Sequence, residues 1–180
     1  MEATINIPDY LSIKDWKYFN SLDHLNDTEK MVSLISKMGQ VDTKWKPTEL
    51  TDVYKTLLES FQDLEPQFYP VIELDGIKYG YTPMTKMTLG EYMDLERLAS
   101  KSHDNIEEIM AILYRPITKH RFSGIKWAFK SSYKIALGEA ENLFKYYDVE
   151  EYDSSKREEN ALKLANIPAS IGLGCMSFFL

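Results

Sequence analysis

The sequence predicts an α+β fold: a mostly helical bundle around a small antiparallel β-hairpin or sheet. Three observations predict it, namely a tight-turn dipeptide between two short apolar runs, apolar residues at helical spacing on both sides of that turn, and small polar residues placed to cap the helices. An isolated hairpin is marginally stable in water, so helices before and after it must cover it.

The predicted hairpin comprises Val71–Leu74 and Ile77–Tyr81, which Asp75 and Gly76 join. A type I′ turn needs positive φ at both central residues, and an Asp-Gly pair adopts it at low cost. Pro83 is expected to end the second strand, because proline has no N–H to donate to a sheet.

Three amphipathic helices are predicted before the hairpin. Ser12 and Asn26 begin the first two as N-caps, each with an acidic residue three positions later. Pro47 suits the first turn of the third helix, where an N–H has no intrahelical partner, and Pro66 follows its end. The three apolar stripes are Ile13, Trp16, Phe19 and Leu22; Met31, Leu34, Ile35 and Met38; and Leu50, Val53, Leu57, Phe61 and Leu64. Together they predict a helical layer with one apolar side.

Two more helices are predicted after the hairpin. Thr88 and Glu91 form a capping box at the start of the first, and Asn105 begins the second. The expected apolar stripes are Leu89, Tyr92, Met93 and Leu98 in the first and Ile106, Ile109, Met110 and Leu113 in the second. Pro116 is expected to end the second helix, because the residue before a proline is pushed out of the helical region.

Residues 117–137 support two interpretations. Apolar and polar residues alternate through Ile125, Trp127 and Phe129, which is the period of a strand, yet the same run fits a helix with a broad apolar face. We predict strand or irregular structure for residues 126–134 and a helix for residues 139–147.

The C-terminal part is predicted to contain an edge strand and two helices. Residues 147–152 alternate weakly, Asp153 is placed to cap a helix, and residues 169–180 form a short apolar segment. We expect that last segment to be a buried helix in which Gly172 and Gly174 allow close packing.

The chain is predicted to divide near Pro116. Residues 1–116 supply the helical layer and the hairpin core, and residues 117–180 supply the basic-aromatic segment and the C-terminal helices, packed on the same domain. Residues 116–124 are the best candidate for a boundary between domains.

Composition and charge narrow the class of protein. The 180 residues are 44% hydrophobic and 27% charged, as in an ordinary globular domain, and the net charge of −7 argues against non-specific nucleic-acid binding by the whole surface. A single cysteine cannot form an intrachain disulfide and fits a reducing compartment. The N-terminus lacks the features of a signal peptide, and the longest apolar run is shorter than the ~20 residues that span a bilayer.

No catalytic or cofactor-binding pattern occurs in the sequence. His24, His103 and His120 are too far apart for the tight cluster that zinc prefers. The acidic residues at 148–153 match no EF-hand, and the glycines form no phosphate-binding loop. Cys175 has apolar neighbours, which predicts a buried, inert thiol. We therefore expect no metal, no cofactor and no enzymatic activity.

A basic stretch with aromatic residues between its cations is the main candidate binding feature. No acidic residue occurs between Glu108 and Glu139, and the span contains Arg115, Lys119, His120, Arg121, Lys126, Lys130 and Lys134. Such a pattern suits a nucleic-acid groove, in which cations contact phosphates and rings stack on bases. It also describes a basic patch that meets an acidic patch on a partner or on a second copy. The net charge favours the protein partner.

The predicted mechanism is protein–protein binding through a few aromatic and apolar anchors. The candidate anchors are Trp127, Phe129, Tyr133, Phe178, Phe179 and Leu180. The last three dock either on the chain's own core or on a partner.

The order of segments in the chain carries a resemblance. It runs LSIKDWKYFNSL, TEKMVSLISKMG, LEPQFYPVIELDGIKYGY, MTLGEYMDLERL, IMAILYRPI, YYDVEEYD and IPASIGLGCMSFFL. This order resembles that of tailed-bacteriophage morphogenesis proteins of the tail-assembly-chaperone-like group, over most of the chain except the segment after Pro116.

The resemblance implies a non-enzymatic virion morphogenesis protein that binds other phage structural proteins. It would act as a tail or neck subunit or as a tail assembly chaperone, as a homo-oligomer or ring, without membrane contact. Its place would be the host cytoplasm during assembly, and the virion if it is a subunit. The alternative function is an internal virion protein that contacts nucleic acid through the stretch from Arg115 to Lys134.

Overall fold

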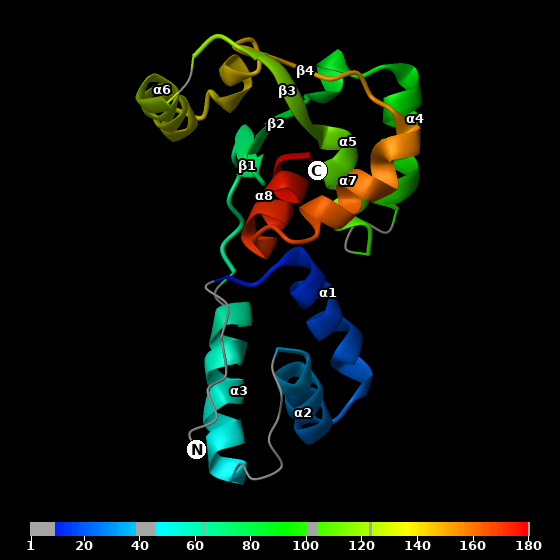
Figure 1. Cartoon of the computed structure of the whole chain (residues 1–180), viewed down its shortest axis with the longest axis vertical. Helices are drawn as coiled ribbons and strands as arrows, with labels where there is room; N and C mark the ends of the chain where they lie inside the picture. The colour runs from blue at the N-terminus through cyan, green and yellow to red at the C-terminus, as the bar shows by residue number, and fades with distance from the viewer. Residues whose placement is uncertain (1–9, 39–45, 63, 101–103, 123, 180) are drawn as a thin grey trace.

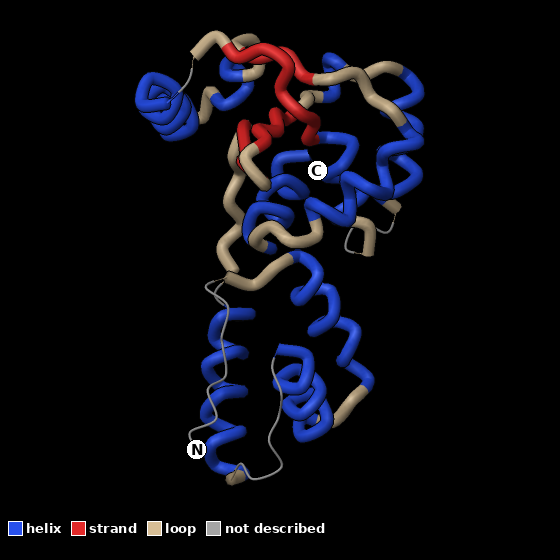
Figure 2. Tube along the Cα trace, in the orientation of Figure 1, coloured by secondary structure: helices blue, strands red, loops and turns tan. Residues whose placement is uncertain are grey.

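The computed structural model describes residues 10–38, 46–62, 64–100, 104–122 and 124–179 (Figure 1). Within these residues lie eight α-helices and one four-stranded antiparallel sheet, which confirms the predicted α+β fold. The strands gather toward one end of the molecule, and helices α2 and α3 stand at the other end (Figure 2).

The sheet is built on the predicted hairpin. Its strands follow the order β1 (Val71–Leu74), β2 (Ile77–Tyr81), β3 (Tyr114–His120) and β4 (Tyr147–Val149). Asp75 and Gly76 have φ values of 52° and 76°, as a type I′ turn requires, so the hairpin prediction is confirmed. The edge strand expected within residues 147–152 is confirmed as β4, which pairs with β3.

The helix before Pro116 ends and Arg115 leaves the helical region, as expected, but Pro116 itself lies inside a strand, which the sequence does not predict. Helix α5 (Ile106–Leu113) ends before it, and β3 begins at Tyr114. Pro116 is the last residue of β3 to pair with β2, and pairing with β4 begins at Ile117. The proline therefore occupies the point where β3 changes partner, and the extended backbone that it imposes on Arg115 continues the strand.

The N-terminal helices form a layer with its own small core. They are α1 (Ile13–Ser21), the 3-10 helix η1 (Leu22–His24), α2 (Asp27–Met38) and α3 (Pro47–Gln62). Ser12 Oγ accepts a hydrogen bond from the Asp15 N–H at 3.1 Å, and Asn26 Oδ1 accepts one from the Glu29 N–H at 3.0 Å, which confirms both predicted caps. Leu11, Leu34 and Ile35 are buried between these helices.

The main core surrounds α5, all of whose apolar residues are buried. The 3-10 helix η2 (Met84–Lys86) and α4 (Leu89–Ala99) precede it, and the 3-10 helix η4 (Ser154–Lys156), α7 (Arg157–Leu164) and α8 (Ala169–Phe179) follow β4. Helices α4, α7 and α8 all contact α5. Because α5 is covered by three helices and continues directly into β3, it links the helical part of the core to the sheet.

Helix α8 is buried as predicted, and its glycines explain how closely it packs. A Cβ at Gly172 would lie 2.8 Å from Ile13 Cδ1, and one at Gly174 would lie 2.3 Å from the backbone of Gln67. Burial raises the pKa of the fully buried Cys175 thiol, so it stays protonated.

None of the helices within the described ranges has both the length and the apolar character needed to span a membrane.

Residues 126–134 are helical, so the prediction of strand or irregular structure there is wrong. Helix α6 (Gly124–Ala136) contains them, and Gly138, with φ of 70°, follows its end. The helix predicted for residues 139–147 is also wrong, since only the 3-10 helix η3 (Ala140–Leu143) forms. The Tyr147 hydroxyl donates to the carbonyl oxygens of Pro70 and Tyr81, which fixes residue 147 in the sheet instead.

Candidate protein-binding surface

One face of α6 is anchored to the sheet. The Trp127 ring lies 4.6 Å from the His120 ring and 6.1 Å from the Tyr147 ring, centroid to centroid. The Lys130 ammonium lies 4.5 Å from the centre of the Phe122 ring and 4.3 Å from that of Tyr146. These contacts fix the rotation of α6 about its own axis.

The opposite face of α6 presents large apolar side chains to solvent. Ile125, Phe129 and Tyr133 follow one another at four-residue spacing and are 88%, 78% and 58% exposed. Figure 1 shows α6 standing at the edge of the molecule, apart from α4, α5 and α7. A contiguous apolar stripe on an anchored helix is typical of an interaction site. We call Ile125, Phe129 and Tyr133 the α6 stripe.

The structure places the six predicted anchor residues in three different settings. Phe129 and Tyr133 lie in the α6 stripe, whereas Trp127 points inward and holds the helix in place. Phe178 and Phe179 belong to α8, but their side chains lie outside the described residues, as does Leu180 altogether.

The basic stretch is not one continuous cationic surface. Arg115 is buried, Lys134 pairs with Glu139, and Lys130 lies between two aromatic rings. Lys119, Arg121 and Lys126 remain exposed. Lys126 lies on α6, and Lys119 and Arg121 lie at the end of β3 that leads into α6, so exposed positive charge lies on and near this helix.

A buried ion pair connects β3 to α4. Glu91 Oε1 lies 2.6 Å from Arg115 Nη1, and the two side chains are 3% and 9% exposed. The Arg115 guanidinium also donates to Thr82 Oγ1 at 3.0 Å. Burial lowers the pKa of Arg115, and the Glu91 carboxylate opposes that shift. The pair lines a cleft of about 480 Å³ that Thr88, Glu150 and Glu151 also border.

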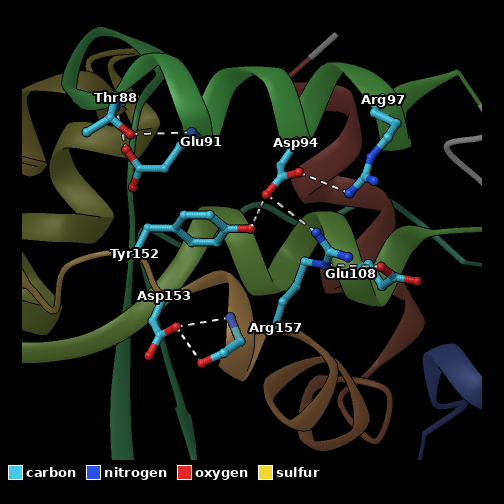
Figure 3. Close-up of polar contacts among 9 residues, drawn as sticks. Thr88, Glu91, Asp94, Arg97, Glu108, Tyr152, Asp153 and Arg157 are labelled. Atoms are coloured by element: carbon cyan, nitrogen blue, oxygen red, sulfur yellow. Dashed lines mark hydrogen bonds and ion pairs between the residues drawn. The ribbon is translucent and has the colours of Figure 1, made fainter.

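The second oxygen of Glu91 completes the predicted capping box. Glu91 Oε2 accepts from the Thr88 N–H, and Thr88 Oγ1 accepts from the Glu91 N–H at 3.3 Å (Figure 3). Both carboxylate oxygens of Glu91 are thus engaged. The sequence identified Glu91 as a cap and gave no sign of its pairing with Arg115, since the two are far apart in the chain.

A second polar network attaches α4 to α5 and α7. Asp94 accepts a hydrogen bond from the Tyr152 hydroxyl at 2.8 Å and pairs with Arg97 at 3.0 Å (Figure 3). Arg157 lies 3.5 Å from Asp94 and 3.2 Å from Glu108. Burial raises the pKa of Tyr152, so its hydroxyl stays a donor. The network fixes α4 on its inner side.

The apolar stripe expected to turn α4 toward the core points to solvent instead. Leu89, Tyr92 and Met93 are 75%, 44% and 61% exposed, so that expectation is wrong for these three residues and right for Leu98. The buried face of α4 carries Glu91, Leu95 and Leu98. Glu91 must face inward to reach Arg115, and residues 89, 92 and 93 then lie on the far side of the helix.

His120 predicts a pH dependence of stability. Neither ring nitrogen has a hydrogen-bond partner within the described part of the chain, burial lowers the His120 pKa, and Lys78 lowers it further. Between the folded-state pKa and about 6.5, the unfolded chain binds more protons at this imidazole than the folded chain. This contribution to stability is therefore complete above about pH 6.5 and is lost as the pH falls toward the folded-state value.

His120→Phe should flatten that part of the profile, because phenylalanine can still pack against Trp127 and cannot take up a proton. The measurement is the free energy of unfolding in urea for both proteins at several values between about pH 5 and pH 7.5. Equal slopes for wild type and variant would show that His120 does not cause the dependence.

No group of three or more His, Cys, Asp or Glu side chains within the described residues could hold a metal ion, and His103 lies outside them.

Comparison of the chain with protein-family models, with curated proteins and with solved structures gives no match.

Proposed function

We propose that this chain is a non-enzymatic bacteriophage morphogenesis protein that binds other phage structural proteins, as a tail or neck subunit or as a tail assembly chaperone. The α6 stripe is its docking surface. The exposure of Ile125, Phe129 and Tyr133 on a helix whose other face is anchored carries this proposal. Because the helix is already held in place, little ordering entropy opposes docking. The phage assignment rests on the resemblance in the order of segments.

Neither Glu91 nor Cys175 is available for chemistry, which supports binding rather than catalysis. Glu91 lines the cleft, but one of its oxygens contacts Arg115 and the other accepts from the Thr88 N–H. The Cys175 thiol is buried and protonated, so it is not a nucleophile.

Nucleic-acid contact through residues 115–134 is the second candidate function. Lys119, Arg121 and Lys126 are exposed near the aromatic rings of α6, which favours it, whereas the burial of Arg115 removes one of the expected cations. Neutralising Lys119 and Lys126 and measuring DNA retention against salt concentration tests it. Phosphate contacts would give the wild type a steep salt dependence that the variant loses, and a flat response in the wild type would exclude them.

Phe129→Asp tests the proposed function in the phage that encodes the chain. A carboxylate at the centre of the α6 stripe should lower the yield of infectious particles at least tenfold, because a charge would have to be desolvated on docking. Mass spectrometry of purified wild-type particles then separates the two roles. A structural subunit is present in a symmetric copy number, and a chaperone is absent.

Val32→Asp is the matched control. Val32 is also an exposed apolar residue on a helix, but it lies on α2, in the N-terminal layer at the other end of the molecule (Figure 1). This variant should keep the wild-type yield. Wild-type yields for Phe129→Asp as well would contradict the proposal.

A further inference from the structure

We propose that the α6 stripe of one copy docks on the outer face of α4 in a second copy, head to tail. This inference rests on the proposed function, since it names the partner of the same surface. It is argued from three features: a second exposed apolar stripe, the charges around both stripes, and their positions in the molecule.

Helix α4 carries the second stripe. Leu89, Tyr92, Met93 and Glu96 are all exposed and stand at positions i, i+3, i+4 and i+7, which places them on one side of the helix. We call Leu89, Tyr92 and Met93 the α4 stripe. Its orientation is fixed, because Glu91 and Asp94 attach the inner side of α4 to Arg115, Tyr152 and Arg157.

The charges around the two stripes are complementary. Lys126, Lys119 and Arg121 lie exposed on and near α6, and residues 109–138 contain no acidic residue. Glu96 lies in line with the α4 stripe, and the neighbouring cation, Arg97, is paired with Asp94. Glu150 and Glu151 are exposed at the cleft beside Thr88, where α4 begins. Opposite potentials on two apolar surfaces favour contact between them and disfavour contact of either surface with its own copy.

The positions of the two stripes require two copies. Helices α6 and α4 stand on opposite sides of the sheet-containing part of the molecule (Figure 1), so the stripes of one chain cannot meet. A contact between different surfaces leaves one stripe free at each end of a dimer. Such a contact continues until it closes into a ring or extends as a filament.

The experiment measures the mass of the full chain in solution by sedimentation velocity, over concentrations from about 1 μM to about 1 mM. The wild type should form species larger than a monomer as the concentration rises. Phe129→Asp on α6 and Met93→Asp on α4 should each lower the association constant at least tenfold. Val32→Asp should associate like the wild type.

Mixing the two variants gives the decisive result. Phe129→Asp keeps an intact α4 stripe and Met93→Asp keeps an intact α6 stripe, so an equimolar mixture should form a heterodimer and nothing larger. The more exposed positions Ile125 and Leu89 provide a second pair, Ile125→Asp and Leu89→Asp, with the same expected behaviour. Circular dichroism establishes that each variant is folded.

Three results would overturn the inference: a monomeric wild type over the whole range, a Met93→Asp variant that self-associates as tightly as the wild type, or a mixture that stays monomeric. Failure here is distinguishable from failure of the proposed function. A monomeric wild type whose Phe129→Asp variant still blocks particle assembly would mean that α6 binds a different protein. Normal particles with Phe129→Asp, beside head-to-tail association of the wild type, would refute the proposed function alone.

Discussion

Arg115→Met is expected to lower the free energy of unfolding by about 3–5 kcal/mol. The variant removes the guanidinium that lies 2.6 Å from Glu91 and leaves a carboxylate that is 3% exposed without its counter-charge. It also leaves Thr82 Oγ1 without its donor. Desolvation of the unpaired charge, rather than the lost attraction, accounts for most of the effect. Urea unfolding at neutral pH, followed by circular dichroism, measures it.

The double variant with Glu91→Gln and Arg115→Met should recover most of that loss, because no unpaired charge remains. Glutamine can also accept from the Thr88 N–H, so the capping box is kept. A double variant as unstable as the single one would assign the loss to packing of the arginine stem instead.

Lys163→Met is the matched control for burial. Lys163 Nζ lies 2.7 Å from Glu159 Oε1, a similar distance, but the two side chains are 42% and 68% exposed. Solvent screens an exposed pair and weakens its contribution to stability, so this variant should remain close to the wild type. A loss as large as that of Arg115→Met would show that burial does not set the cost.

Features that depend on a few neighbouring residues could be predicted from the sequence. The Asp75-Gly76 turn, the caps at Ser12 and Asn26, and the capping box at Thr88 are all present. Each depends on backbone groups within three residues of the side chain that satisfies them. The residues next to this turn and these caps are therefore enough to predict them, without any long-range contact.

The orientation of α4 could not be predicted, although its start could. Helical periodicity found the stripe of Leu89, Tyr92 and Met93, but periodicity cannot tell which side of a helix faces the core. The ion pair between Glu91 and Arg115 decides it, and this contact links residues on different elements. Periodicity therefore predicts the stripe but not its exposure, which only the structure shows.

Periodicity is likewise not enough to predict helix α6. The strand-like alternation of residues 125–129 competes with the four-residue spacing of the α6 stripe, and nothing local distinguishes them. The packing of Trp127 against His120 and Tyr147 anchors the helix. His120 lies on β3 and Tyr147 on β4, and the pairing of these two strands cannot be predicted from neighbouring residues. The sequence predicts the aromatic residues of this segment as anchors, but which of them packs inward and which is exposed depends on the helix.

Gly174→Ala is expected to lower the free energy of unfolding by about 3 kcal/mol, at the upper end of the usual cost of overpacking. A Cβ at this position would lie 2.3 Å from the backbone carbon and oxygen of Gln67, and no rotamer change can move a backbone away. The Gln67 N–H donates to Ser170 O at 2.9 Å, which holds the segment before β1 against helix α8. An added Cβ would force this segment and α8 apart. Thermal or urea unfolding by circular dichroism measures the loss.

Gly90→Ala is the control that isolates the close approach from the chemistry of the substitution. Gly90 also lies in a helix, α4, and no atom lies within 4 Å of the position that its Cβ would take. Alanine is favoured over glycine in a helix by up to about 1 kcal/mol, so this variant should be as stable as the wild type or slightly more stable. If both variants were destabilised equally, the close contact of α8 with Gln67 could not be the cause. A loss confined to Gly174→Ala would show that α8 needs glycine there to pack beneath the segment that leads into the hairpin.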